Sequence, residues 1–304
     1  TLDAKINYTI EDVDNRPYLG FSGANTALAL LGLPGNFDQQ WLQDSAVDAN
    51  GDYVFWNSAT RIINPYYSLY HMKNESKKNR LLGYISLNYK INDWLDFNFK
   101  SGIDTFNYDY YNYSPKTTPL AEWGEMTQID SKTTEINTDF LLSANKELND
   151  DWTIGASVGG NLMNFENKTT TILGKNQGSD NLISINNYND FVIGKSNPRK
   201  EVRSFYGFAN IGFKDYAFVD VTGRQDWSST LKQGNNGYFY PSITGAVILT
   251  KAFEKIKNNT IPYLKVRASY AEVGGDTNPY ANNTYFDFPY STNGTNFSTV
   301  NNNT

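Results

Sequence analysis

The residue types that most enzymes need are scarce in this chain of 304 residues. It has no cysteine and a single histidine, His71. The sequence therefore excludes a zinc–thiolate site, an iron–sulfur cluster and a cysteine nucleophile within this segment. A serine–histidine triad would have one available base, and neither a Gly-x-Ser-x-Gly motif nor a phosphate loop occurs. Scattered carboxylates leave a glycosidase-type pair open, but we expect no enzyme, no catalytic residue and no cofactor.

Aromatic side chains are the better candidates for binding, because Tyr and Trp combine an apolar ring with a polar group that suits sugars or a partner protein. Several fall in the polar stretch Phe106–Thr134, which we expect to be an outward loop. The first tyrosines could instead continue a strand into an aromatic girdle, and such packing is favoured over direct ligand contact. An Arg-x-Asp element follows later, and we expect its two residues to pair or to hold the loop rather than to bind ligand. The candidate contacts to a substrate or to a partner protein that covers it are Tyr108, Tyr110, Tyr111, Tyr113, Trp123, Arg224, Asp226 and Trp227.

The acidic stretch Asp48–Asp52 has the alternating oxygen ligands that calcium prefers. However, its glycine, Gly51, stands at the fourth position rather than the sixth, and no glutamate stands at the twelfth. A plain Asn-Gly turn before the strand-like segment Tyr53–Trp56 is the favoured interpretation. We expect no metal site.

These candidates would be positioned by a regular series of hairpins in which short turns alternate with long polar stretches. The expected long stretches are 11–79, 106–134, 166–200, 226–236 and 272–304. The expected strands are Lys5–Ile10, Leu81–Ile91, Leu95–Ile103, Ile136–Lys146, Trp152–Leu162, Arg203–Phe213, Ala217–Gln225 and two that follow. Short turns on one side and long loops on the other are typical of an outer-membrane β-barrel. A short helix within Ala24–Leu33 and one or two helical turns in Lys251–Lys257 are also expected.

Within the strands, apolar and polar residues alternate. In Leu81–Ile91, one face carries leucine and isoleucine while the other carries Tyr84, Ser86 and Asn88. Such alternation over roughly 10 residues matches a tilted strand that crosses a bilayer. We expect the polar face to line a lumen, and the expected lumen residues include Asp96, Asn98, Lys100, Asp104, Lys265 and Arg267. The alternative is a large soluble antiparallel sheet with one buried face.

Composition agrees with this fold class: all-β, an antiparallel transmembrane β-barrel, here a partial barrel of about nine strands with short periplasmic turns and long extracellular loops. The chain contains 22 Tyr, 18 Phe and 6 Trp, many near strand ends, as membrane-interface girdles require. The mean hydropathy of −0.56 excludes a helical membrane protein. The net charge of −6 argues against a nucleic-acid partner, which would need a basic face.

We expect residues 1–304 to be a portion of a larger barrel domain. Thr1–Ala4 shows no feature of a signal peptide, the end is a polar asparagine-rich stretch, and an odd number of strands does not close a bacterial barrel. The expectation is that the plug domain, the signal peptide and the C-terminal strands are absent from this segment.

Three motifs between Arg203 and Tyr280 resemble a known family. A Lys214-Asp215 turn is followed by an Arg-x-Asp-x-Ser-Ser element, then by the aromatic-Pro-Ser strand in Gly237–Phe253, and then by Leu264–Gly274, a Leu-Lys-x-Arg-x-Ser-Tyr strand. In this order they resemble the barrel of SusC-like (RagA-type) TonB-dependent outer-membrane transporters. Three positions depart from the family pattern: Trp227 where Gly is common, Val247 near a position often held by Trp, and Gly275-Asp276 in place of Gly-Asn.

The resemblance implies a multi-pass protein of the bacterial outer membrane that takes up bulky nutrients with a SusD-like lipoprotein as a lid. TonB would act through the plug domain, and outer-membrane lipid would surround the barrel. The substrate implied is an oligosaccharide, preferred from family frequency alone, or a peptide. Two alternatives stay open: an outer-membrane adhesin or structural barrel without active transport, and a soluble β-sandwich binding module.

Overall fold

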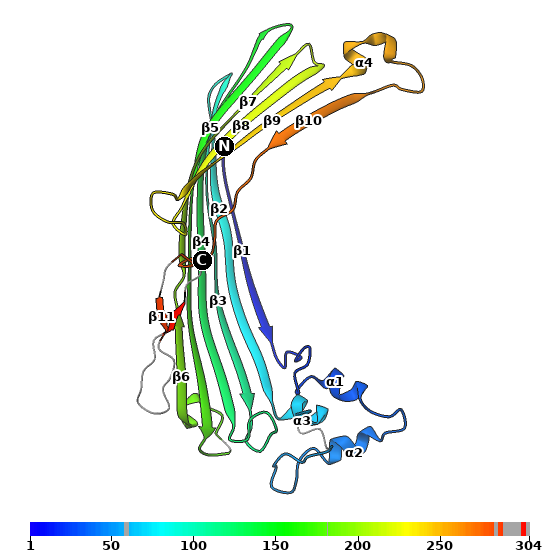
Figure 1. Ribbon diagram of the computed structural model, residues 1–304, viewed down its shortest axis with the longest axis vertical. Coiled ribbons are helices and arrows are strands. Elements are labelled where there is room, and N and C mark those ends of the chain that lie inside the picture. The colour runs from blue at the N-terminus through cyan, green and yellow to red at the C-terminus, as the bar shows by residue number, and fades with distance from the viewer. Residues whose placement is uncertain (58–60, 181, 283–284, 288–298, 302–304) are drawn as a thin grey trace.

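Ten antiparallel strands form one curved sheet in the computed structural model, which describes residues 1–57, 61–180, 182–282, 285–287 and 299–301. Neighbouring strands follow the order β1-β2-β3-β4-β5-β7-β8-β9-β10, and β6 pairs with β5. The sheet bends into an arc with β1 and β10 at its two edges (Figure 1). The strands are β1 (Leu2–Val13), β2 (Lys73–Asn92), β3 (Leu95–Ser114), β4 (Glu125–Asn149), β5 (Trp152–Gln177), β6 (Tyr188–Ser196), β7 (Arg199–Phe213), β8 (Ala217–Ser228), β9 (Gly237–Ile248) and β10 (Lys265–Ala271). A separate pair is formed by β11 (Tyr285–Asp287) and β12 (Thr299–Asn301).

The strand register places the apolar residues of successive strands on one face, because residues directly opposite each other in a sheet share a face. Phe99 lies opposite Leu87 on one side and opposite Phe140 on the other. Many of these side chains are exposed, such as Ile85 and Val158 at 48% each. This apolar face continues across the sheet through Ile6, Phe97, Leu142, Ile211, Val221, Ile243 and Val266.

Tight turns join the strands at one end of the sheet, as the sequence predicts. Lys214 and Asp215 have φ values of 49° and 54°, the left-handed conformation of a two-residue hairpin turn that matches the twist of its strands. The rings of Trp152, Phe213 and Tyr216 pack together beside this turn, with centroid distances of 4.6 and 5.7 Å between successive rings. The longer connection at this end contains α4 (Leu249–Ala252) and the 3-10 turn η2 (Glu254–Ile256), which confirms the helical turns expected there.

The prediction that residues 106–134 and 166–200 are loops is wrong. Strand β3 continues to Ser114 and β4 already begins at Glu125, while β5 continues to Gln177 and is followed by β6 and β7. Beyond the apolar face, these strands carry many polar residues on both sides, so no regular alternation marks them in the sequence. Pairing continues because it satisfies the backbone N–H and C=O groups in any environment. Of the expected loop 272–304, a part lies outside the described residues.

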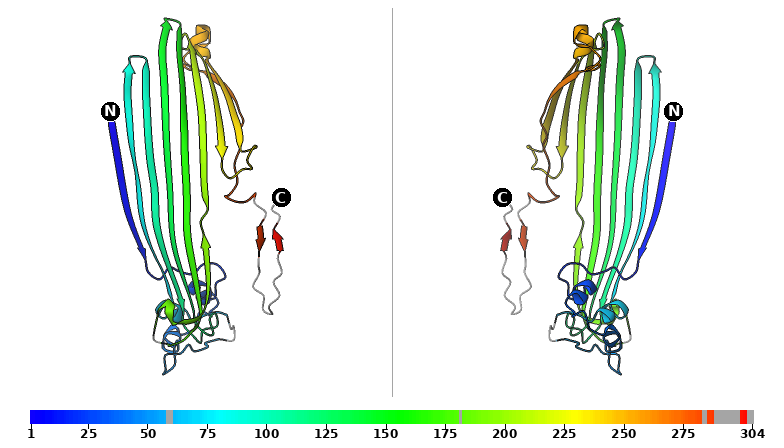
Figure 2. Two further views of the ribbon diagram at one scale, coloured as in Figure 1. Left: turned by 90° about the vertical axis from the view of Figure 1, so that its left-hand side faces the viewer. Right: turned by 90° about the vertical axis from the view of Figure 1, so that its right-hand side faces the viewer.

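A small helical subdomain lies between β1 and β2, at the end of the sheet opposite α4 (Figures 1 and 2). It contains α1 (Thr26–Leu31), which confirms the expected helix, as well as α2 (Gln39–Asp44) and α3 (Pro65–Tyr70). Each helix has an Asn or Asp N-cap whose side chain accepts backbone N–H bonds. The core of the subdomain consists of Ala24, Ala46, Tyr53, Ile63, Tyr67 and Met72. None of the helices in the described residues is long and apolar enough to cross a membrane.

Within this subdomain, Asp48–Asp52 forms a tight turn. The Asp48 Oδ1 atom accepts bonds from the N–H groups of Asn50 at 2.8 Å and Asp52 at 2.9 Å. Gly51 has a φ of 88°, which suits glycine at this position. The expected turn is therefore confirmed, and Tyr53 continues from it into a single β-bridge with Val47 rather than into the expected strand.

Candidate functional site

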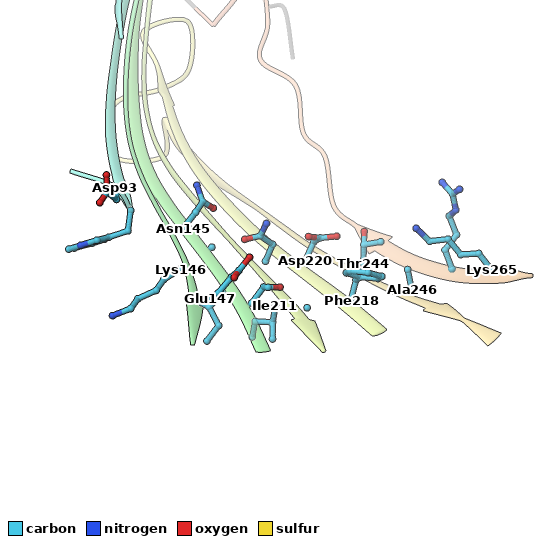
Figure 3. A pocket seen from close by; sticks show the side chains of 17 residues that line it. Asp93, Asn145, Lys146, Glu147, Ile211, Phe218, Asp220, Thr244, Ala246 and Lys265 are labelled. Carbon is cyan, nitrogen blue, oxygen red and sulfur yellow. The ribbon is translucent and has the colours of Figure 1, made fainter. Parts of the chain in front are cut away.

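A continuous polar row crosses the sheet on the face opposite the apolar one, near the hairpin turns. Each member lies directly opposite the next on the neighbouring strand. Figure 3 shows Asn145 and Asp220 pointing to the concave side of the sheet, and Lys146 and Ile211 pointing to the other side. The polar face is therefore concave and the apolar face convex. The row consists of Asn145, Gly155, Asn210, Asp220, Thr244 and Ser269.

A cavity of about 880 Å³ opens over this row. Its lining includes charges of both signs, among them Asp220, Lys265 and Arg267. The ammonium group of Lys265 lies 5.6 Å from the centroid of the Phe218 ring, a favourable cation–π distance. The sequence predicts Lys265 and Arg267 as lumen residues, and the structure places both on the concave face.

Gly155 is the member of the row that has no polar side chain. A Cβ atom there would lie 1.9 Å from the Asn210 Oδ1 atom and 2.6 Å from the Asn145 Oδ1 atom. The glycine therefore leaves space in which two amide side chains from flanking strands approach each other. The sequence has an asparagine near the hairpin turn in each flanking strand, but that these two side chains meet over Gly155 can be seen only when the register is known.

The other four predicted lumen residues share the concave face on β3. Lys100 lies opposite Asp139, and the Asp139 Oδ2 atom accepts a 2.8 Å bond from the hydroxyl of Tyr206. Asp104 is paired with Arg80 through two hydrogen bonds. Asp96 and Asn98 lie on the same face by their register with β2. The concave wall is thus polar with mixed charge over most of its length.

Arg224 and Asp226 form the ion pair that the sequence predicts. The Arg224 Nε atom donates to Asp226 Oδ1 at 2.7 Å, and Arg224 Nη2 donates to Ser204 Oγ at 2.7 Å. The guanidinium also lies 5.3 Å from the centroid of the Tyr206 ring. With its donors directed to these groups, Arg224 braces β8 against β7 on the concave face.

Trp227 lies on the other face of the sheet from this pair. It lies opposite Arg203 on the convex face and is 42% exposed. The alternation of a strand sends adjacent residues to opposite faces, so Trp227 points away from the concave wall.

The predicted tyrosines lie on the part of β3 farthest from the hairpin turns rather than in a loop, and they are divided between the two faces of the sheet. Tyr108 and Tyr110 stack with their ring centroids 6.4 Å apart. Tyr113 is 4% exposed and packs in a buried cluster with Met126 and Tyr188. The alternative of strand continuation is therefore what the structure shows, and Tyr113 is buried away from any ligand.

The remaining two aromatic candidates differ in exposure. Burial, followed by the neighbouring Tyr113 and Glu75, raises the pKa of the Tyr111 hydroxyl to about 12, so it remains a neutral hydrogen-bonding group. Trp123 lies in the short loop between β3 and β4 and is 65% exposed. Among the predicted aromatic contacts, Trp123 and the stacked pair Tyr108–Tyr110 retain surfaces that a partner could reach.

No protein-family model matches the chain. The TonB-dependent receptor P26 of Formosa agariphila is 23% identical over 286 residues, which is 91% of this chain and 28% of that protein. The structure of the RagAB peptide transporter superposes with a TM-score of 0.74 at 16% identity, over 99% of this chain and 34% of that one. The RagAB peptide importer in its 'closed-closed' state gives a TM-score of 0.73 over the same shares.

These matches extend over nearly all of this chain, whereas the chain spans only 28% of the curated relative and 34% of the solved transporter chains. The antiparallel order and the alternation of faces are those that the sequence motifs led us to expect. The chain has the fold of a section of the β-barrel of a SusC-like (RagA-type) TonB-dependent outer-membrane transporter.

Proposed function

We propose that the protein carrying this chain takes up bulky nutrients across the bacterial outer membrane, driven by TonB and aided by a SusD-like surface lipoprotein. The observation that supports this most is the division of the sheet into an exposed apolar convex face and a polar concave face. An exposed apolar surface of this extent requires a non-aqueous neighbour. A bilayer supplies that neighbour, and the concave wall then encloses a polar lumen.

In this proposal, residues 1–304 supply part of the barrel wall and its extracellular extension. The plug domain, the signal peptide and the remaining strands belong to the rest of the protein, and TonB acts through the plug. The cavity over the polar row at the turn end is on the wall that such a plug would face. The helical subdomain and the outer parts of β2 to β5 form the rim where a lipoprotein lid would dock.

For the substrate, an oligosaccharide is our first choice and a peptide the second. The stacked rings of Tyr108 and Tyr110 and the exposed indole of Trp123 offer faces of the kind that sugars pack against. Support for a peptide comes from the structural neighbour RagAB, which is a peptide transporter. A transport role, rather than an enzymatic one, agrees with the relatives, which are a TonB-dependent receptor and that transporter.

The test uses cells that produce the full-length protein and cells from which it has been deleted. We expect the protein in the outer-membrane fraction, a surface lipoprotein that co-purifies in detergent, and uptake of labelled oligosaccharide that a protonophore abolishes. Labelled peptides assayed in parallel distinguish the second substrate class.

Three outcomes would contradict the proposal in different ways. A protein in the soluble fraction would restore the β-sandwich alternative. A barrel that purifies alone would favour an adhesin or structural barrel, as would uptake of both substrates that is unchanged by the deletion.

A further inference from the structure

Four cations gather on the convex face directly beyond its apolar residues. We call Lys132, Lys168, Arg199 and Arg203 the basic patch. Arg203 lies opposite Leu162 on β5 and opposite Trp227 on β8. The basic patch thus adjoins the apolar face without a gap, although the chain as a whole has a net charge of −6.

Two of these cations face each other in the sheet. Lys132 on β4 lies directly opposite Lys168 on β5, and like charges at such positions destabilise a strand pair. Lys168 is paired with Glu166 at 3.1 Å. Lys132 forms no ion pair within the residues that the structure describes. Lys132, which is exposed, is therefore available to an external anion.

The carboxylates of the patch neutralise only part of its charge. Glu166 is shared, since it contacts both Lys168 at 3.1 Å and Arg199 at 2.6 Å. Glu201 contacts Arg203 at 2.7 Å. The four cations and the two carboxylates that contact them carry a formal charge of 4 − 2 = +2.

The cationic groups are accessible, and three of them, Lys132, Lys168 and Arg199, line a groove. The side chains of Lys168, Arg199 and Arg203 are 57%, 62% and 71% exposed. A groove of about 490 Å³ runs beside them, and its lining includes Lys132 together with apolar Ile136. Cationic groups and apolar side chains are thus presented on one surface, in the order in which a lipid presents its phosphate and its acyl chains.

We propose that the basic patch binds the phosphate groups of a phosphorylated glycolipid of the outer leaflet, whose acyl chains lie against the neighbouring apolar face. This rests on the proposed function, because it needs the convex face to lie in the membrane. Phosphate oxygens would accept from Lys132 and Lys168, relieving their repulsion, while Arg199 offers a planar group suited to phosphate. Leu162 and Phe205, which is 55% exposed, would contact the acyl chains.

The test measures equilibrium binding of lipid A, a phosphorylated glycolipid, to the purified full-length protein in detergent. The double variant Lys132→Gln/Lys168→Gln should bind roughly thirtyfold more weakly, because each cation near a lipid surface contributes about a factor of five. The matched control is Lys5→Gln/Lys90→Gln, which removes the same charge from exposed positions of the concave face. Its binding should equal that of the unmodified protein.

A second comparison needs no variant: phosphatase-treated lipid A should bind the unmodified protein far more weakly than lipid A that keeps its phosphates. Equal binding of the two lipids, or unchanged binding by the Lys132/Lys168 variant, would overturn the proposal. Outer-membrane location and energised uptake are measured separately in cells. A functioning transporter that shows no preference for the phosphorylated lipid therefore refutes this inference and leaves the proposed function standing.

Discussion

Asp276 fastens the segment after β10 to the outer ends of β7 and β8. Its carboxylate contacts Lys200 Nζ at 2.6 Å and accepts a bond from the buried hydroxyl of Ser228 at 2.7 Å. Both charged side chains are largely buried, at 18% exposed for Asp276 and 22% for Lys200. Such a charged contact stabilises because its partners are already positioned and partly shielded from water.

We predict that Asp276→Asn destabilises the attachment of residues 272–282 to the sheet, lowering its free energy of opening by about 1–2 kcal/mol. Burial alone would raise the pKa of Asp276, but the bonds from Lys200 and Ser228 outweigh it and lower the pKa. A lowered pKa contributes stability above the unfolded value of about 4, and this is lost as the pH falls through the folded value. Hydrogen exchange of this segment at neutral and acidic pH is the measurement.

The matched control for Asp276 is Glu272→Gln, which removes a carboxylate whose contact, with the hydroxyl of Tyr270, is exposed. In this variant, hydrogen exchange of residues 272–282 should equal that of the unmodified protein at each pH. Equal protection of the segment in the Asp276 variant and the unmodified protein would show that the ion pair does not fasten it.

Gly23 is the point of closest backbone approach in the helical subdomain. A Cβ atom there would lie 1.8 Å from the carbonyl oxygen of Arg61, and the N–H of Ile63 bonds the Gly23 carbonyl at 2.9 Å. We predict that Gly23→Ala destabilises this subdomain by about 2–3 kcal/mol, because backbone atoms must move to admit the methyl group. Limited proteolysis between residues 15 and 71 measures the effect.

Gly35→Ala serves as the control for Gly23, since nothing lies within 4 Å of its added Cβ. It should leave proteolysis unchanged or slow it slightly. Cleavage of the Gly23 variant at the control's rate would contradict the prediction.

At the residue scale, sequence patterning predicts the pair Arg224–Asp226, and the structure places the neighbouring candidate Trp227 on the opposite face. The pair is separated by two positions and therefore shares a face, whereas Trp227 is displaced by one. The buried position of Tyr113 was not predictable, because it depends on Tyr188 of β6, a strand whose sequence shows no regular alternation of apolar and polar residues.

At the scale of the strand, β8 offers a direct test of the two faces. Val221 is on the convex face and Thr222 follows it on the concave face. We predict that Val221→Lys lowers stability in a bilayer by about 2–4 kcal/mol if it lies near mid-membrane, because the ammonium group would enter the acyl region. Denaturant unfolding of the full-length protein in lipid vesicles is the measurement.

Thr222→Lys is the control for Val221, as it adds the same group on the same strand but directs it to the polar side. Its cost should be well under that of Val221→Lys. Equal costs for the two variants would mean that both faces meet similar surroundings, contrary to the assignment of lipid and lumen.

The strands near the hairpin turns could be predicted because their apolar residues recur at every second position, and the turn residues fix where they end. Their outer extensions could not, since Tyr108 and Glu125 stand in polar sequence without a marked face. Of the helices, α2 and α3 each have only 6 residues, too short to be stable alone. They depend on the core around Ile63 and Tyr67, which tertiary packing assembles.

At the scale of the molecule, the helical subdomain is separable from the sheet that carries it. Val13 at the end of β1 lies opposite Ser76 near the start of β2. The two ends of the segment 15–71 are therefore attached to neighbouring points of the sheet. The subdomain has its own buried core. Its side-chain bonds to the sheet include Arg16 Nη2 to Ser76 Oγ and Asn112 Nδ2 to the Tyr18 hydroxyl, both 2.7 Å.

We predict that replacing residues 15–71 of the full-length protein with a short Gly/Ser turn leaves barrel assembly intact but reduces lipoprotein co-purification and nutrient uptake. Assembly should survive because the register of β1 with β2 is set by twelve residue pairs that the replacement does not touch. Function should decline because the subdomain belongs to the proposed extracellular rim at which the lid would dock. Outer-membrane abundance and uptake, measured on the same cells, separate the two effects. Normal uptake would show that the rim docks its partner elsewhere, while loss of the protein from the membrane would show that the subdomain is needed for assembly.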